Sequence, residues 1–96
     1  MRIFWLARAV ADRDAIVACI ARDSPRAALD QGDRIQAGVD RLADNPQAGR
    51  RGRHAGTREK VVPRTPYIVV YRLSTSETVE VLRVLHGAQQ WPAAES

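Results

Sequence analysis

The sequence predicts an α+β fold in which an N-terminal strand and a two-helix hairpin precede a three-stranded antiparallel β-meander. Two observations favour this class. Residues 8–45 repeat apolar side chains every three or four positions, whereas residues 57–86 contain short runs rich in Val, Ile and Tyr between turn-forming residues. Each helix has one apolar face to cover, so we expect both on one face of one mostly antiparallel sheet. A length of 96 residues suits a single domain over residues 1–96.

The N-terminal half should supply the first strand and both helices. Residues 1–6 are apolar and bulky, which indicates a strand inside the sheet or at a covered edge. In the first helix the aliphatic side chains fall mostly on one side, and we expect Cys19, next to them, to be partly buried. The second helix has clear boundaries, because Ser24 can cap its N-terminus before Pro25 and Asn45-Pro46 can stop it.

The C-terminal half should begin with a loop and continue as the meander. Residues 47–56 are rich in glycine and arginine and are expected to form an exposed basic loop. Residues 67–73 are apolar at odd-numbered and even-numbered positions alike, except for Arg72, as expected of a central strand buried on both faces. The meander should end at residue 86, and residues 87–96 form a short tail.

The excess positive charge of the chain is confined to one short segment. Residues 1–49 hold equal numbers of arginines and aspartates, whereas residues 50–64 carry a local balance of +5. Such a segment predicts an anionic partner, either nucleic acid or an acidic protein, although a solvated basic loop without a partner would look the same. The cationic residues expected to bind a target or nucleic acid are Arg50, Arg51, Arg53, Arg58, Lys60 and Arg64.

Composition argues against several classes of protein. One cysteine permits no internal disulfide, and with two histidines the chain lacks a structural zinc set; we expect no metal and no cofactor. The longest apolar run, residues 67–71, is far shorter than the roughly 20 residues of a membrane span. No signal-peptide apolar region is evident near the N-terminus, so a cytoplasmic location and no membrane association are expected.

Five motifs follow one another along nearly the whole chain. They are Ser24-Pro25-Arg26-Ala27-Ala28, Asn45-Pro46 with Gly49-Arg50, GTREKVV at 56–62, PYIVVYRL at 66–73 and VLRVLHGAQQWP at 81–92. In this order and at this length they resemble the RelE/ParE superfamily of small toxins from bacterial type II toxin-antitoxin modules.

The resemblance implies one of two activities. RelE-like members cleave mRNA in the ribosomal A site, as metal-independent endoribonucleases, whereas ParE-like members block DNA gyrase. Either kind is growth-inhibiting and is neutralised by a cognate acidic antitoxin encoded beside it. The complex commonly represses its own operon, so operator DNA would be bound only through the antitoxin.

If the protein is a nuclease, the resemblance assigns catalysis to Arg58, Arg83 and His86. Cationic groups would stabilise the pentacoordinate phosphate, and a histidine could exchange protons near neutral pH. Each residue also has a structural explanation: Arg58 as a solvated strand residue, His86 as a group that caps a strand end, and Arg83 as a charged group that reaches solvent or a carboxylate partner. Cleaving relatives typically carry an arginine where this chain has Ile68.

The departure at Ile68 favours ParE-like gyrase inhibition over RelE-like ribosome-dependent mRNA cleavage. A non-toxic nucleic-acid-binding module is a third possibility. We expect the antitoxin to contact Tyr67, Arg83 and Trp91, the last of which could equally pack the chain terminus onto the sheet edge.

Overall fold

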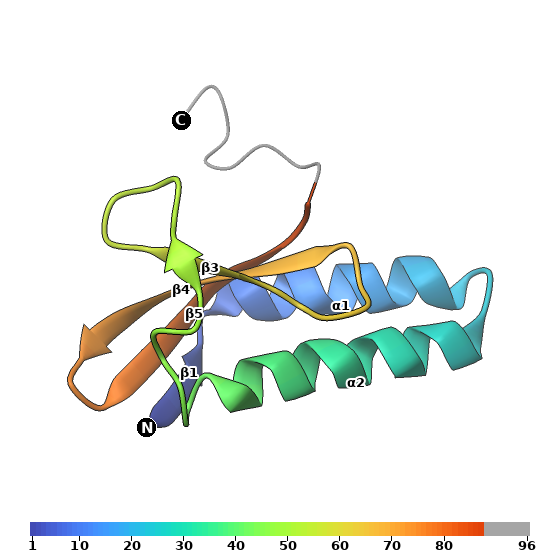
Figure 1. Cartoon of the computed structure of the whole chain (residues 1–96). Helices are drawn as coiled ribbons and strands as arrows, with labels where there is room; N and C mark the ends of the chain where they lie inside the picture. Colours follow the sequence, from blue (N-terminus) through green and yellow to red (C-terminus); the bar gives the residue numbers. More distant parts are fainter. Residues whose placement is uncertain (88–96) are drawn as a thin grey trace.

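A computed structural model describes residues 1–87, which form two helices and one five-stranded sheet (Figure 1). The elements in chain order are β1 (Arg2–Trp5), α1 (Ala7–Ala21), α2 (Pro25–Arg41), β2 (Arg50–Arg51), β3 (Arg58–Val61), β4 (Tyr67–Thr75) and β5 (Thr78–His86). Within the described residues, no helix has the length and apolar character needed to cross a bilayer.

The sheet has the strand order β1-β5-β4-β3-β2. Strands β2 to β5 pair antiparallel, and only β1, which returns through the helical hairpin, pairs parallel to β5. The predicted α+β class, with one mostly antiparallel sheet, is therefore confirmed. We call the face of the sheet that carries the helices the helix side, and the opposite face the open face.

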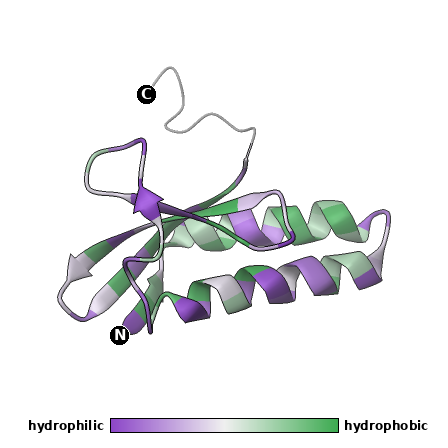
Figure 2. Cartoon of the chain, viewed as in Figure 1, coloured by the Kyte–Doolittle hydropathy of each residue, from purple (hydrophilic) through white to green (hydrophobic). Residues whose placement is uncertain are grey.

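Both helices pack on one face of the sheet, as predicted (Figures 1 and 2). The side chain of Ser24 accepts a hydrogen bond from the backbone N–H of Ala27 at 3.1 Å, and Pro25 occupies the first turn, so α2 begins where the sequence indicates. The main core contains Ala9, Ile35, Val39, Leu42, Val62, Val69, Tyr71, Val79, Val81 and Val84. A smaller cluster on the open face contains Ile68, Val70 and Leu85, with Leu82 packed against it.

An irregularity in β5 changes which side chains face the helices. The register pairs Val70 with Arg83 but Tyr71 with Val81, so Leu82 is the additional residue of a β-bulge. Val81 and Val84 both reach the main core as a result, although strict alternation would place them on opposite faces.

Several local expectations are wrong. The basic loop contains a short strand, β2, which pairs with β3. Cys19 is exposed; in α1 only Ala9 is buried, and Val10, Ile16, Val17 and Ile20 are half-buried. Strand β1 lies at the edge of the sheet, one of the two positions predicted for it, and it leaves Phe4 57% exposed. The end of β4 extends beyond the helices, so Leu73 is exposed and burial on both faces holds only for residues 68–71.

Candidate functional site

The cations of residues 50–64 are divided between the two faces of the sheet. Cross-strand partners lie on the same face of a sheet. Arg50 pairs with Glu59, and Glu59 pairs with Val70 of the open-face cluster. Arg51 pairs with Arg58, which in turn pairs with the core residue Tyr71. Lys60 pairs with Val69, also of the main core, so Arg51, Arg58 and Lys60 belong to the helix side.

Glu59 neutralises part of the basic segment. Its side chain is only 1% exposed, and its carboxylate accepts from the backbone N–H of Arg53 at 2.9 Å and from Nε of Arg53 at 3.2 Å. Nη2 of Arg50 approaches the same carboxylate at 3.4 Å. Burial acts to raise the pKa of Glu59, but the backbone and guanidinium of Arg53 outweigh it, so the pKa lies below its usual value. Arg50 and Arg53 therefore hold the loop over a buried anion.

Arg58 and Tyr71 together fix the connection that follows α2. Nη1 of Arg58 donates to the carbonyl oxygen of Gly49 at 2.8 Å. The buried Tyr71 hydroxyl donates to the carbonyl of Pro46 at 2.7 Å and accepts from the N–H of Gly49 at 2.9 Å. Burial raises the pKa of Tyr71 despite the hydrogen bond from Gly49, so the hydroxyl stays protonated. The side chain of Arg58 thus binds the protein's own backbone.

Arg83 forms a two-pronged ion pair with Asp12 of α1. Nε of Arg83 lies 2.7 Å from Oδ2 and Nη2 lies 3.0 Å from Oδ1, and both side chains are 15% exposed. Oδ2 also accepts from the backbone N–H of Val84 at 3.0 Å. The hydrogen bond that Arg83 donates to Asp12 raises the pKa of Arg83 above its ordinary value. The sequence predicted that Arg83 reaches either solvent or a carboxylate partner. The structure shows a carboxylate partner, but no local signal identified Asp12, which is 71 residues away.

His86 is exposed at the end of β5 and packs edge-on against Tyr67, with ring centroids 5.9 Å apart and planes at 89°. The two are cross-strand partners, and Tyr67 packs against the main core, which places His86 on the helix side. Tyr67 therefore lies at the rim of the core. Trp91, the third residue expected to contact the antitoxin, lies outside the described residues.

The structure does not bring Arg58, Arg83 and His86 together. Arg83 is the cross-strand partner of Val70, but its guanidinium is held by Asp12 of α1. Arg58 and His86 belong to the helix side. The cross-strand partners of Arg58 and His86 are four residues apart along β4, about 13 Å, and the two strands flank β4, about 10 Å apart. The two backbones are therefore separated by roughly 16 Å.

The floor of the open face is apolar. Ile68 lies there beside Val70 and Leu85, at the position where the family resemblance leads us to expect an arginine in a nuclease. Farther along the sheet, Arg72 of this face pairs with Glu80 at 2.6 Å. Within residues 1–87, the cations of the basic segment that form no side-chain ion pair or hydrogen bond are Arg51, Lys60 and Arg64.

Comparisons with known proteins agree on the family. Residues 3–91 match the family model described as ParE toxin of type II toxin-antitoxin system, parDE. The Y4kP protein of Sinorhizobium fredii is 47% identical over 91 residues, covering 95% of this chain and 93% of that protein. Toxin RelE1 of Caulobacter vibrioides is 36% identical over 87 residues, covering 86% of this chain and 89% of that toxin.

The fold is also that of a solved toxin-antitoxin structure. A chain of the chromosomal ParDE system from P. aeruginosa superposes with a TM-score of 0.79 at 28% identity, covering 90% of this chain and 95% of that chain. The family implies an antitoxin partner. The chain belongs to the ParE toxin family, within the RelE/ParE superfamily, and is the toxin of a type II toxin-antitoxin system.

Proposed function

We propose that this toxin arrests growth by inhibiting DNA gyrase and does not cleave RNA. The observation that carries the proposal is the separation of Arg58, Arg83 and His86, the three groups that a nuclease mechanism would need at one phosphate. General acid-base catalysis requires groups within hydrogen-bond reach of the reacting atoms, about 3 Å. In this structure the Arg58 guanidinium is held at the Gly49 carbonyl and the Arg83 guanidinium at the Asp12 carboxylate. With the backbones of Arg58 and His86 roughly 16 Å apart, the three groups do not converge on one phosphate in this arrangement.

The side-chain environments support the same conclusion. Arg83 and Arg58 are both engaged, one with the Asp12 carboxylate and the other with the Gly49 carbonyl. The open face offers Ile68 where a cationic group would be needed for phosphate stabilisation. The open face, with an apolar centre flanked by charged pairs, suits contact with the surface of a protein such as gyrase.

RelE-like cleavage of ribosome-bound mRNA is the second candidate. It is favoured by one specific observation, the 36% identity to a protein named Toxin RelE1. Under this alternative the ribosome would have to complete the catalytic site, with Arg58, Arg83 and His86 contributing. Both targets are cytoplasmic, which is where we place the toxin's action.

Two assays on the purified toxin separate the candidates. Supercoiling of relaxed plasmid by gyrase should fall as toxin is added and recover when the antitoxin is added in excess. Primer extension on mRNA bound to a programmed ribosome should show no new cleavage in the A-site codon. Cleavage there, with supercoiling unaffected, would replace the proposal by the RelE-like alternative. Binding of operator DNA is expected only when the antitoxin is present.

A further inference from the structure

A hollow of about 770 Å³ opens on the hairpin that β2 and β3 form at the edge of the sheet. Three arginines line it, Arg51, Arg53 and Arg58, together with the short side chains of the loop between the two strands. In Figure 1 this loop projects from the edge of the sheet. Among residues 1–87, no acidic side chain lines the hollow. We call it the arginine hollow.

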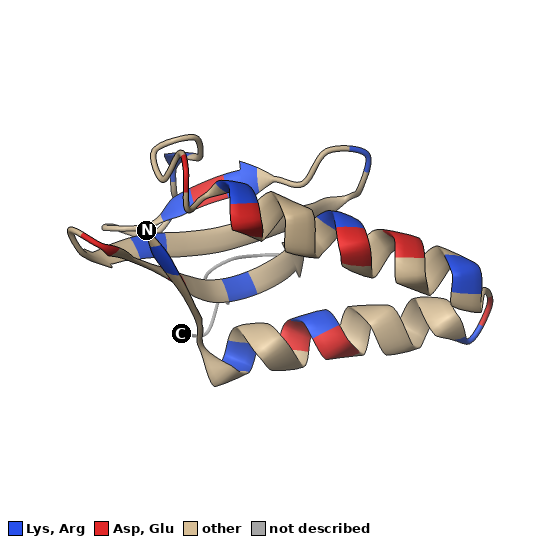
Figure 3. Ribbon diagram, turned by 90° about the horizontal axis from the view of Figure 1, so that it is seen from below, with Lys and Arg blue, Asp and Glu red and all other residues tan. Residues whose placement is uncertain are grey.

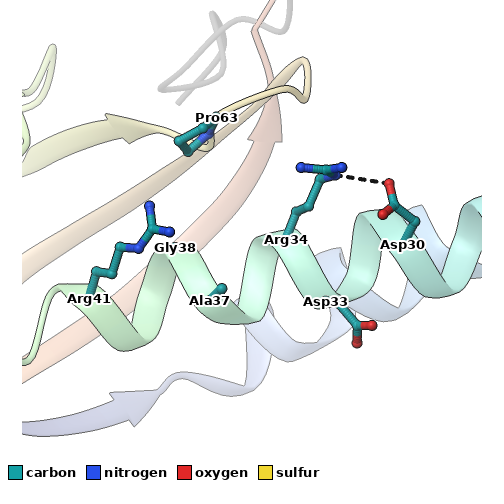
Figure 4. Close-up of a pocket in the computed structure, with 7 residues that line it drawn as sticks. All are labelled: Asp30, Asp33, Arg34, Ala37, Gly38, Arg41 and Pro63. Atoms are coloured by element: carbon teal, nitrogen blue, oxygen red, sulfur yellow. Dashed lines mark hydrogen bonds and ion pairs between the residues drawn. The ribbon is translucent and has the colours of Figure 1, made fainter.

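Other groups of cations on the surface are mixed with carboxylates. Each helix carries as many Asp as Arg residues, and Figure 3 shows them interspersed along both helices. Figure 4 shows a hollow beside α2, where Arg34 pairs with Asp30 at 2.9 Å. A neighbouring hollow holds Arg41 and Lys60 together with Asp44. The arginine hollow differs from both of these because its lining carries charge of one sign.

Two of its arginines lie directly opposite each other. Arg51 and Arg58 are cross-strand partners, so their Cβ atoms are about 5 Å apart on the same face of the sheet. Like charges in this arrangement destabilise a sheet. Within residues 1–87, Arg51 forms no side-chain ion pair or hydrogen bond, and Arg58 contacts only the uncharged carbonyls of Gln47 and Gly49. An anion bound between the two guanidinium groups would remove this repulsion.

The hollow also offers more hydrogen-bond donors than the chain itself uses. Only Nη1 of Arg58 is engaged, and the backbone N–H groups of Ala55 and Gly56 donate to no group within residues 1–87. Guanidinium groups and the N–H groups of loops are the donors that proteins use for phosphate oxygens. Ala55 supplies the only apolar side chain among the described lining residues, whereas a protein partner would need larger apolar anchors. The lining therefore suits a phosphate better than a protein segment.

We propose that the arginine hollow binds a backbone phosphate of the DNA on which gyrase acts. The choice of DNA rests on the proposed function, because a toxin bound to gyrase is held beside the DNA of that enzyme. The choice of a phosphate rests on the hollow alone. Contacts to phosphates carry no sequence information, and a single phosphate contact gives little affinity for free DNA. The toxin without antitoxin therefore gains no affinity for operator DNA from this site.

The hollow divides the basic segment by role. Arg50 and Arg53 cover the buried carboxylate of Glu59. Arg58 holds the Gly49 carbonyl and faces the hollow as well, so its replacement would change both the fold and the binding site. Arg51 has no such structural contact within residues 1–87 and is the position at which binding can be tested separately.

The first experiment titrates inorganic phosphate into the purified ¹⁵N-labelled toxin, with sodium chloride keeping the ionic strength constant. We expect saturable shifts of the NMR signals of Arg51, Gly56 and Arg58, and none at Arg26 in the first turn of α2. Arg51→Glu should abolish these shifts without lowering Tm, because it places a carboxylate opposite Arg58. Loss of binding in a variant of unchanged or higher Tm cannot result from unfolding. Absence of saturable shifts in the hollow, or equal shifts in Arg51→Glu, would overturn the inference.

The second experiment compares Arg51→Gln with Arg26→Gln, an equal loss of charge at an exposed position. Both are measured for inhibition of supercoiling and, by biolayer interferometry, for affinity toward gyrase without DNA. Arg51→Gln should raise the toxin concentration needed for half-inhibition by about tenfold, since a hydrogen bond to a charged group is lost. Its affinity for DNA-free gyrase should stay within about twofold of the unchanged toxin, and Arg26→Gln should alter neither quantity.

An equal loss of affinity for DNA-free gyrase in Arg51→Gln would assign the hollow to a protein contact and overturn the inference. Slower cleavage of ribosome-bound mRNA by Arg51→Gln, with supercoiling unaffected by any toxin, would assign the phosphate to RNA and overturn the choice of DNA. The phosphate titration uses no gyrase. Failure of the gyrase proposal and failure of the phosphate site are therefore distinguishable.

Discussion

Arg83 and Asp12 form an ion pair that joins the last strand to the first helix at the point where β1 ends. The backbone N–H of Leu6 donates to the carbonyl of Val81. Farther along β5, the carboxylate of Asp12 accepts from the N–H of Val84, as the backbone of a neighbouring strand would. The pair thus closes the edge of β5 where β1 no longer covers it, and it occupies an arginine to which the family resemblance assigned a role in catalysis.

Removal of either partner should destabilise the fold. Arg83→Ala leaves a half-buried carboxylate, and Asp12→Ala leaves both a guanidinium and the Val84 N–H without this acceptor, so each should lower the free energy of unfolding by about 2–4 kcal/mol. The double variant should lose less than the sum of the two, since the interaction can be lost only once. Urea denaturation monitored by circular dichroism measures all three.

The exposed Arg72–Glu80 pair provides the comparison. Its arginine is 50% exposed, so Arg72→Ala should cost less than about 1 kcal/mol. Additive losses at Asp12 and Arg83, or losses as small as that of Arg72→Ala, would contradict a structural role for the Arg83–Asp12 pair.

The buried carboxylate of Glu59 should make stability depend on acidic pH. Its pKa is lower in the folded chain than in the unfolded chain, so its contribution is fully present above the unfolded value, about 4.3, and is lost as pH falls through the folded value. Glu59→Gln should lower stability at pH 7 by about 1–3 kcal/mol, because Arg50 and Arg53 lose their counter-charge.

The measurement is the free energy of unfolding from pH 7 down to pH 3 for both proteins. The difference between the unchanged protein and Glu59→Gln should stay constant down to about pH 5 and shrink below it. A difference that grows as pH falls would show that the carboxylate is not the stabilising form.

The buried hydroxyl of Tyr71 should be needed for the connection after α2. Tyr71→Phe removes two hydrogen bonds, to Pro46 and Gly49, and should cost about 1–3 kcal/mol. Gly49→Ala should also destabilise, because its Cβ would lie 2.7 Å from the Tyr71 hydroxyl and 3.0 Å from the Glu59 carbonyl. Thermal or urea unfolding would measure both variants.

Tyr67→Phe is the matched control, since its hydroxyl forms no hydrogen bond within residues 1–87. It should change stability by less than about 0.5 kcal/mol. Equal effects at the two tyrosines would contradict the role given to Tyr71.

Local signals predicted most of the fold, but non-local pairings determined the site. The Ser24-Pro25 cap and the apolar alternation of residues 57–86 are properties of neighbouring residues, so helix and strand positions could be read from the sequence. The bulge at Leu82 depends on the register between β4 and β5, which alternation alone does not reveal. The same holds for Arg83, whose partner Asp12 is brought near only by the packing of α1 against β5.

Counting charges along the sequence likewise located the basic segment, but it did not show on which face of the sheet each cation lies. Six cations within residues 50–64 form no single surface, because strand pairing places Arg50 beside Glu59 on the open face and Lys60 on the helix side. Arg41 joins Lys60 from a helix that the charge count treats as neutral.

The most direct test of the central claim is a gyrase supercoiling assay with the purified toxin, run beside primer extension on a programmed ribosome. Our account predicts dose-dependent loss of supercoiling, relieved by the antitoxin, and intact mRNA in the A-site codon at the same toxin concentrations. Cleaved mRNA together with unchanged supercoiling would contradict it.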